Sequence, residues 1–263
     1  MDKYIANQKI REELERRRGI LINRSYDKSF YMEDLDREQI QSFLEQGEIP
    51  NRPTDVPSLM KQFCTSAFSY ALPRRYLASF IENIPMRDTI HIALSRAFDD
   101  DAFLKDSNWY PESLFKLASR IQAKENYDLS RKQFKPRIIS VLISGSKQLS
   151  EELKNGLDPF YQKIENVTSP SEMWKFVNDF SSPIFNVGPA LISDFFKEIG
   201  FTQYVKVDHH LSKEFPKLMP SPKSCSLNKK QIFISSIENA NSIGITPFHL
   251  DKIFYLWGRN GRK

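Results

Sequence analysis

The chain has 263 residues, of which 40% are hydrophobic and 27% are charged, an ordinary balance for a folded globular protein. It is long enough to bury a substantial core, while its 9 glycines argue against glycine-rich nucleotide loops and a turn-rich all-β fold. Lys and Arg number 38 against 33 Asp and Glu, and the resulting charge of +5 permits an anionic partner without establishing one.

Metal and cofactor sites are not expected. The 2 cysteines, Cys64 and Cys225, cannot build a four-thiolate zinc site or ligate an iron–sulfur cluster alone, and there are only 4 histidines. Cys64 lies on an apolar helical stripe and is expected to be buried and unreactive. The N-terminal residues lack the apolar segment of a signal peptide. No run approaches the roughly 18 apolar residues of a membrane span, so we expect a cytoplasmic protein.

Helical periodicity dominates the chain and predicts an all-α fold of ten or more helices. The charge run at 12–18 (EELERRR) is typical of a solvated helix. Further helices are predicted over 56–70, 74–84, 85–98, 111–124, 130–144, 149–165, 170–180, 189–199, 228–240 and 246–257. Segments 137–144 and 231–237 alternate as strands do, but each is short enough to be buried helix. Connections are predicted at 47–55, 99–111 and 215–230.

The segment 182–211 is the most informative part of the sequence. It begins with a tight turn that opens a helix at Pro189, a position where proline is favoured. That helix carries an apolar stripe, and Gly200 is well placed to end it. Asp208 follows, 20 residues after Gly188, in the run Val-Asp-His-His-Leu. Taken alone, Asp208 is a good N-cap for a short helix.

These residues resemble the helix-hairpin-helix (HhH-GPD) DNA glycosylases, the superfamily that includes endonuclease III. Their hairpin typically reads Leu-Pro-Gly-Val-Gly-x-Lys-Thr-Ala, and an apolar residue followed by Asp-x-His comes at the same distance after its last glycine. Here Val187-Gly188 matches the hairpin, and Val207-Asp208, His210 and Leu211 match the second element. The direct likeness covers only the segment 182–211.

The resemblance implies a fold of two helical lobes around a cleft, with the helix-hairpin-helix motif at about 170–199. One lobe would span 100–214 and carry the motif and the catalytic aspartate, and the other would combine 1–99 with 215–263. The implied activity is hydrolysis of the N-glycosidic bond of a damaged or modified base flipped out of double-stranded DNA. A monomer without a nucleotide cofactor, and without a membrane partner, is expected to perform it.

The resemblance also implies roles for individual residues. Asp208 would be the catalytic carboxylate that stabilises the positive charge developing on the sugar and orients a water. Backbone amides of the hairpin would hold DNA phosphates, and its carbonyls would hold a monovalent cation, as they often do in the family. The implied DNA-binding residues are Phe185, Asn186, Val187, Gly188 and Ala190.

The chain departs from the family pattern at three positions. Asn186 replaces the first hairpin glycine and Phe185 replaces the proline, although asparagine tolerates a left-handed backbone better than most residues. Ala190 stands where bifunctional members carry a nucleophilic lysine. Because alanine cannot form a Schiff base, the expected nucleophile is water and the expected enzyme is monofunctional. The cluster-binding cysteines of the endonuclease III branch are absent.

Several alternatives stay open. Capping and catalysis by Asp208 do not exclude each other. His210 is more typical of a packing residue and His209 of an exposed one, while Lys206 is a weak candidate for a substitute amine. Candidates for base stacking are Trp109, Tyr110, Trp174 and Phe185. A non-catalytic helix-hairpin-helix DNA-binding protein and an all-α interaction protein are the rival functions, and the sequence does not identify the excised base.

Overall fold

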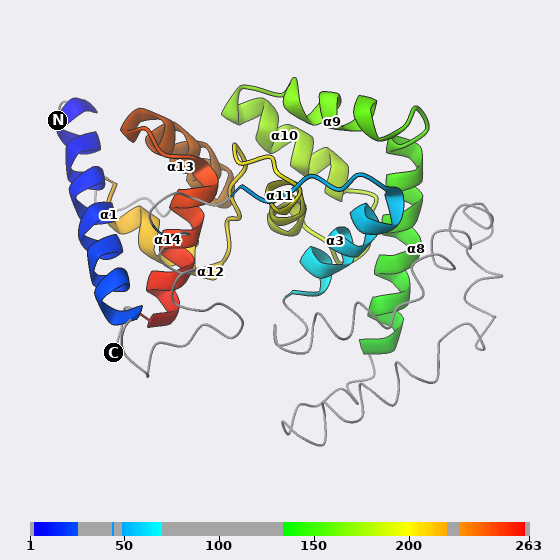
Figure 1. Cartoon of the computed structure of the whole chain (residues 1–263), viewed down its shortest axis with the longest axis horizontal. Coiled ribbons are helices and arrows are strands. Elements are labelled where there is room, and N and C mark those ends of the chain that lie inside the picture. The colour runs from blue at the N-terminus through cyan, green and yellow to red at the C-terminus, as the bar shows by residue number, and fades with distance from the viewer. Residues whose placement is uncertain (1–2, 26–43, 45–48, 70–133, 220–226, 261–263) are drawn as a thin grey trace, which may run out of the picture. The chain divides into compact units, whose positions relative to one another are not determined.

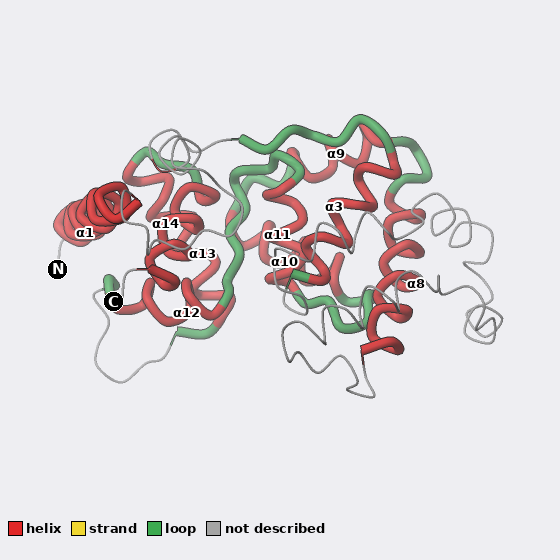
Figure 2. The backbone as a smooth tube through the Cα atoms, turned by 60° about the horizontal axis from the view of Figure 1, so that its bottom comes forward, coloured by secondary structure: helices red, strands yellow, loops and turns green. Residues whose placement is uncertain are grey.

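The computed structural model describes residues 3–25, 44, 49–69, 134–219 and 227–260. Helices are the regular secondary structure of these residues, which contain nine α-helices, one 3-10 helix and no strand (Figures 1 and 2). The all-α prediction is therefore confirmed for this part of the chain. The helices are α1 (Lys3–Ser25), α3 (Val56–Phe68), α8 (Phe134–Glu152), α9 (Leu157–Glu165), α10 (Pro170–Ser181), α11 (Pro189–Glu198), α12 (His209–Glu214), the 3-10 helix η2 (Phe215–Lys217), α13 (Lys229–Ile243) and α14 (Pro247–Asn260).

Most predicted helices in the described ranges match observed ones, with one correction. The segments 137–144 and 231–237, which alternate as strands do, are helical within α8 and α13, as the all-α prediction requires. The break predicted between 144 and 149 is wrong, because α8 continues to Glu152 and the chain turns at Gly156, which has a φ of 97°. The predicted connection at 215–230 begins with η2. The predicted helices 74–84, 85–98 and 111–124, and the connection 99–111, lie outside the described residues.

The chain divides into two compact units. Unit 1 comprises 1–51, 167–177 and 196–263, and unit 2 comprises 52–166 and 178–195. The helices α10 and α11 contribute residues to both units. The hairpin residues 185–190 therefore belong to unit 2 and Asp208 to unit 1. The lobes expected from the resemblance, 1–99 with 215–263 and 100–214, stay a prediction.

Unit 1 is built on α14, which packs against α1, α12 and α13. In Figure 1 the blue α1 and the red α14 lie side by side. The buried positions of α1 are Ile10, Leu14, Arg17 and Leu21, which recur at the spacing of one helical face. The prediction of a solvated helix at 12–18 is thus wrong for Leu14 and Arg17, because this face meets α13 and α14. No helix in the described ranges is sufficiently long and apolar to cross a membrane.

Unit 2 is built on the contact between α3 and α8. Phe63 of α3 is buried with its ring edge-on to that of Phe195, at 5.5 Å between centroids. Cys64 beside it is fully buried, and burial raises the pKa of its thiol well above the usual range, as expected for an unreactive cysteine. The segment before α3 is tied to α9 by the hydroxyl of Tyr161, which donates to the carbonyl of Pro53 at 2.7 Å.

A matched pair of glycine substitutions tests the α3–α8 contact. A Cβ on Gly145 of α8 would lie 2.4 Å from Cε1 of Phe63, whereas one on Gly19 of α1 would meet nothing within 4 Å. Gly145→Ala should destabilise the protein by about 1–3 kcal/mol through overpacking. Gly19→Ala should stabilise it by about 0.5–1 kcal/mol through helix propensity. Urea unfolding monitored by circular dichroism measures both, and equal effects of the two substitutions would contradict the close approach at Gly145.

Candidate functional site

The turn 182–188 joins α10 to α11 and is anchored by two buried side chains, Ile184 and Val187. The amide of Phe185 donates to Oγ of Ser144 at 3.0 Å, which fixes the turn to α8. The Val187 amide donates to the carbonyl of Ile184 at 3.4 Å. Between these anchors the Phe185 side chain is 69% exposed. The turn therefore presents an aromatic side chain to solvent from a fixed backbone.

Asn186 has a φ of 61°, and it is the only described residue other than glycine with a positive φ. This is the left-handed region, which asparagine enters more readily than other side chains. The sequence places Asn186 where the hairpin of the family has its first glycine. Asn186 is thus left-handed at the position of that glycine, a conformation that the sequence allowed but did not predict.

Gly188 caps the beginning of α11. Its carbonyl accepts the amides of Leu191 at 2.9 Å and Ile192 at 3.2 Å, and Pro189 follows as the first helical residue. Pro189 has no N–H and those two amides donate to Gly188, which leaves the amide of Ala190 to meet an anion, favoured there by the helix dipole. A Cβ at Gly188 would meet nothing within 4 Å. Packing within the protein therefore does not require glycine here, and the open space outside the turn is available to a partner.

Asp208 is the N-cap of α12. Its backbone is extended, with φ −87° and ψ −171°, and its Oδ1 accepts the amide of Leu211 at 2.9 Å. The N-cap interpretation is therefore confirmed. The cap uses one of two carboxylate oxygens, each of which can accept more than one hydrogen bond, so a second partner is compatible with it. Val207 beside it is 3% exposed, so the chain enters the core immediately before the cap.

The two histidines after Asp208 behave as expected from the sequence. His209 is exposed, and His210 is half-buried with its ring edge-on to Tyr255 at 5.7 Å between centroids. A Cβ on Gly258 of α14 would lie 2.1 Å from Nδ1 of His210. The histidine therefore packs where α14 has no side chain, and this contact seats α12 on α14.

Sequence reasoning missed the buried ion pair between Lys197 of α11 and Asp251 of α14. Both side chains are 3% exposed, and the Lys197 ammonium donates to Oδ2 of Asp251. Lys252 forms a second ion pair with Glu198 at 2.8 Å, so adjacent residues of the two helices are paired twice. The missed signal is that Lys197 and Asp251 each interrupt an apolar helical run.

The neighbourhood of Asp251 includes Asp208. Burial raises the pKa of Asp251 to about 6, with Asp208 acting in the same direction and the ammonium groups of Lys197 and Lys252 acting against it. Electrostatically, therefore, the Lys197–Asp251 pair and Asp208 belong to one charged cluster in unit 1. Neutralisation of Asp251 by Lys197 limits the negative charge that this cluster gathers around Asp208.

The structure says less about the roles of the remaining candidate residues. Trp174 packs against the ring of Phe233 at 5.4 Å between centroids, as a residue of the unit 1 core does. Lys206 is half-buried, and Trp109 and Tyr110 lie outside the described residues. Within the described ranges no group of His, Cys, Asp and Glu side chains could hold a metal ion.

Comparisons with known proteins returned no matching family model, no similar curated protein and no similar solved structure. The resemblance of 182–211 to the helix-hairpin-helix glycosylases therefore depends on the residues of that segment. Any function built on it is a proposal.

Replacing the buried ion pair tests its role in unit 1. Lys197→Met or Asp251→Leu alone should destabilise the protein by about 3–5 kcal/mol, because each leaves a buried charge without its partner. The double variant should recover most of that loss, since two apolar side chains need no hydration. Chemical denaturation of the four proteins measures the coupling. Additive losses in the double variant would contradict the pairing.

Proposed function

We propose that this protein is a monofunctional DNA glycosylase with the two-lobed fold of the helix-hairpin-helix class. The α10–turn–α11 segment would be its hairpin, and Asp208 its catalytic residue. The observation that carries the proposal is the left-handed backbone of Asn186, with φ 61°, where the family motif has glycine. A substitution that breaks the sequence motif thus keeps the backbone conformation that glycine would provide. The spacing from Gly188 to the Val-Asp-His-His-Leu run supports the same assignment.

In this proposal the hairpin grips duplex DNA through backbone amides. The amide of Ala190 is the first of α11, because Pro189 has no N–H, and at the helix end it suits a phosphate oxygen without reading the sequence. Gly188 leaves the outside of the turn open, so a phosphate can approach the backbone closely. The exposed ring of Phe185 lies beside it and offers an apolar contact to a sugar or an unstacked base.

Asp208 would act on the sugar of the flipped nucleotide. Positive charge develops at C1′ as the C1′–N bond breaks and the base leaves with the bonding electrons. The carboxylate stabilises this charge and accepts the proton of the water that attacks C1′, and the departing base gains a proton in turn. Because Ala190 supplies no amine, the sugar stays in the strand with a hydroxyl group at C1′, and the DNA backbone is not cut.

Asp208→Asn separates catalysis from capping. Asparagine is as good an N-cap as aspartate, so α12 should form and the protein should stay folded. It cannot accept the proton of water, so base release should fall by at least about a hundredfold while DNA binding is kept. The assay is mass spectrometry of free bases released from a mixture of alkylated, oxidised, deaminated and virus-modified duplex DNA.

Each outcome of this assay has a distinct meaning. A base released by the wild type alone would support the proposal and identify the substrate. Release by both proteins would remove Asp208 from the chemistry. Salt-sensitive DNA binding without release by either protein would favour a non-catalytic hairpin protein instead. Absence of binding at low salt would leave an all-α interaction protein.

Gly188→Ala tests the hairpin without disturbing the fold. Because a Cβ there meets nothing within 4 Å, its effect on stability should stay within about 0.5 kcal/mol. The methyl group should hold a phosphate away from the backbone, and the loss of one charge-assisted hydrogen bond weakens DNA binding by about tenfold or more. Gly19→Ala is the matched control, since its site is equally open and lies on α1. Fluorescence anisotropy with a labelled duplex measures both, and equal affinities would count against the hairpin contact.

A further inference from the structure

The short helix α12 depends on its surroundings. It has six residues, too few for a helix to form stably in isolation. Asp208 caps its beginning and His210 seats its first turn against α14. Its end is Glu214, a carboxylate that is only 4% exposed. The position of Asp208 is thus set by how both ends of α12 are held.

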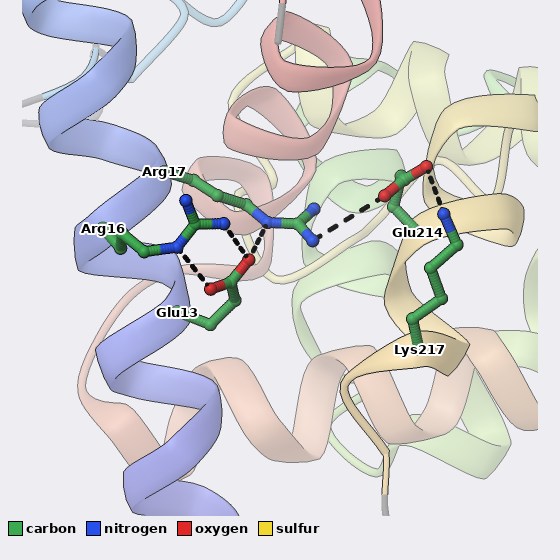
Figure 3. Close-up of polar contacts among 5 residues, drawn as sticks. All are labelled: Glu13, Arg16, Arg17, Glu214 and Lys217. Carbon is green, nitrogen blue, oxygen red and sulfur yellow. Dashed lines mark hydrogen bonds and ion pairs between the residues drawn. The ribbon is translucent and has the colours of Figure 1, made fainter. Parts of the chain in front are cut away.

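Two cations from different elements hold Glu214 (Figure 3). Lys217 of η2 donates to its Oε1 at 2.8 Å, and Nη2 of Arg17 lies 3.7 Å from its Oε2. Lys217 comes only three residues after Glu214. Its contact therefore joins α12 to η2, the next turn of the same chain segment. The Arg17 contact joins α12 to α1, a helix that is distant from it in the sequence. Arg17 therefore ties the end of α12 to α1 through a charge, in addition to the packing of the C-cap residue Phe215 against Phe254 of α14.

The Arg17 guanidinium is built into the core of unit 1. Its side chain is 5% exposed, and it lies over the rings of Trp257 at 4.9 Å and Phe254 at 5.2 Å, both on α14. Its Nε donates to Oε1 of Glu13 at 2.8 Å, while Nη1 is buried and has no hydrogen-bond partner in the described part of the chain. The planar guanidinium of arginine can stack on rings and reach two carboxylates at once, which the ammonium group of lysine cannot do.

Arg16 provides an internal comparison. It also binds Glu13, at 2.7 Å, and also lies over Trp257, at 5.4 Å. Its side chain is 54% exposed, however, and its ion pair in the described part of the chain is with Glu13 (Figure 3). Two neighbouring arginines thus share a carboxylate and a ring, and differ in burial and in the contact to Glu214.

We propose that Arg17 is a positioning residue for Asp208, acting through Glu214 and the body of α12. This rests on the proposed function, in which Asp208 is the catalytic residue. Glu214 lies six residues after Asp208, about 9 Å along the helix, so a shift at one end moves the other. Misplacement of a catalytic group by about 1 Å costs on the order of a hundredfold in rate. Arg17 lies on α1 and is not part of the hairpin, so its loss should slow chemistry and spare DNA binding.

The test compares Arg17→Met with Arg16→Met in the full chain. We expect Arg17→Met to slow single-turnover base release from the DNA mixture by about ten- to a hundredfold, while the Kd for a labelled duplex stays unchanged. Arg16→Met should match the wild type in both. Arg17→Lys, which keeps the charge and loses the fork, should fall between them. Equal rates for Arg17→Met and Arg16→Met, or a loss of affinity that matches the loss of rate, would overturn the proposal.

A second measurement does not depend on enzymatic activity. Hydrogen exchange of the Leu211 amide, which bonds to Oδ1 of Asp208, reports whether α12 is held. We expect exchange in peptides covering 205–218 to be about tenfold faster in Arg17→Met than in Arg16→Met. If the wild type releases no base, the proposed function fails, and this exchange still decides the structural link. Unchanged exchange in α12 would overturn it.

A further variant covers the case in which Arg17→Met does not fold. Glu214→Gln removes the charge on the α12 side and leaves Arg17 among the rings of Phe254 and Trp257. It should reproduce both the slower base release and the faster exchange of α12. Wild-type values for both in Glu214→Gln would overturn the proposal.

Discussion

The buried ion pair between Lys197 and Asp251 constrains how the end of α11 meets α14 in unit 1. Taking two ions out of water is expensive, and their attraction offsets that expense only when the atoms meet in a close and well-directed contact. At 3% exposure neither side chain can turn to solvent, so the end of α11 and the middle of α14 have one acceptable register. The neighbouring pair of Lys252 and Glu198 repeats the same register one residue along each helix. A contact between apolar side chains would tolerate a shift of one helix along the other, whereas a buried ion pair does not.

Once α14 is fixed in this way, it supports the surroundings of Asp208 at several levels. Its missing side chain at Gly258 receives His210, and its rings at Phe254 and Trp257 receive Arg17. The helix α12 is too short to hold its own conformation, so these contacts and the Asp208 cap decide where it lies. The carboxylate is therefore presented by a scaffold of polar and aromatic contacts, as a catalytic group requires if its position is to be kept within a fraction of an ångström.

The sequence predicted much of the local structure because local signals agreed with one another. Proline at the first position of α11 and glycine after its end mark that helix within one residue. The sequence indicated that Asn186 tolerates a left-handed conformation, because few other side chains enter that region, but it did not predict that conformation. Asp208 could be predicted as a cap from its own chemistry and the short apolar pattern that follows.

What escaped prediction depends on partners distant in sequence. Arg17 sits in a run of charges that is typical of a solvated face, and its burial depends on distant partners, the rings of α14 and the carboxylate of Glu214. Lys197 and Asp251 are more than fifty residues apart, so the sequence around either residue does not indicate its partner. The continuation of α8 through Gly145 was missed because the ring of Phe63 fills the space that a side chain there would need. In each case tertiary contact outweighs the local preference.

Two residues of the turn 182–188, Asn186 and Gly188, differ in what the backbone requires of them. At Asn186 the requirement is a backbone conformation, and a side chain that tolerates a positive φ satisfies it. At Gly188 the backbone imposes no such need, and the space around the missing side chain is open rather than filled by the protein. Among the described residues, neither strain nor internal packing requires glycine at this position. In the proposed function, the close approach of a DNA phosphate to the backbone would account for it.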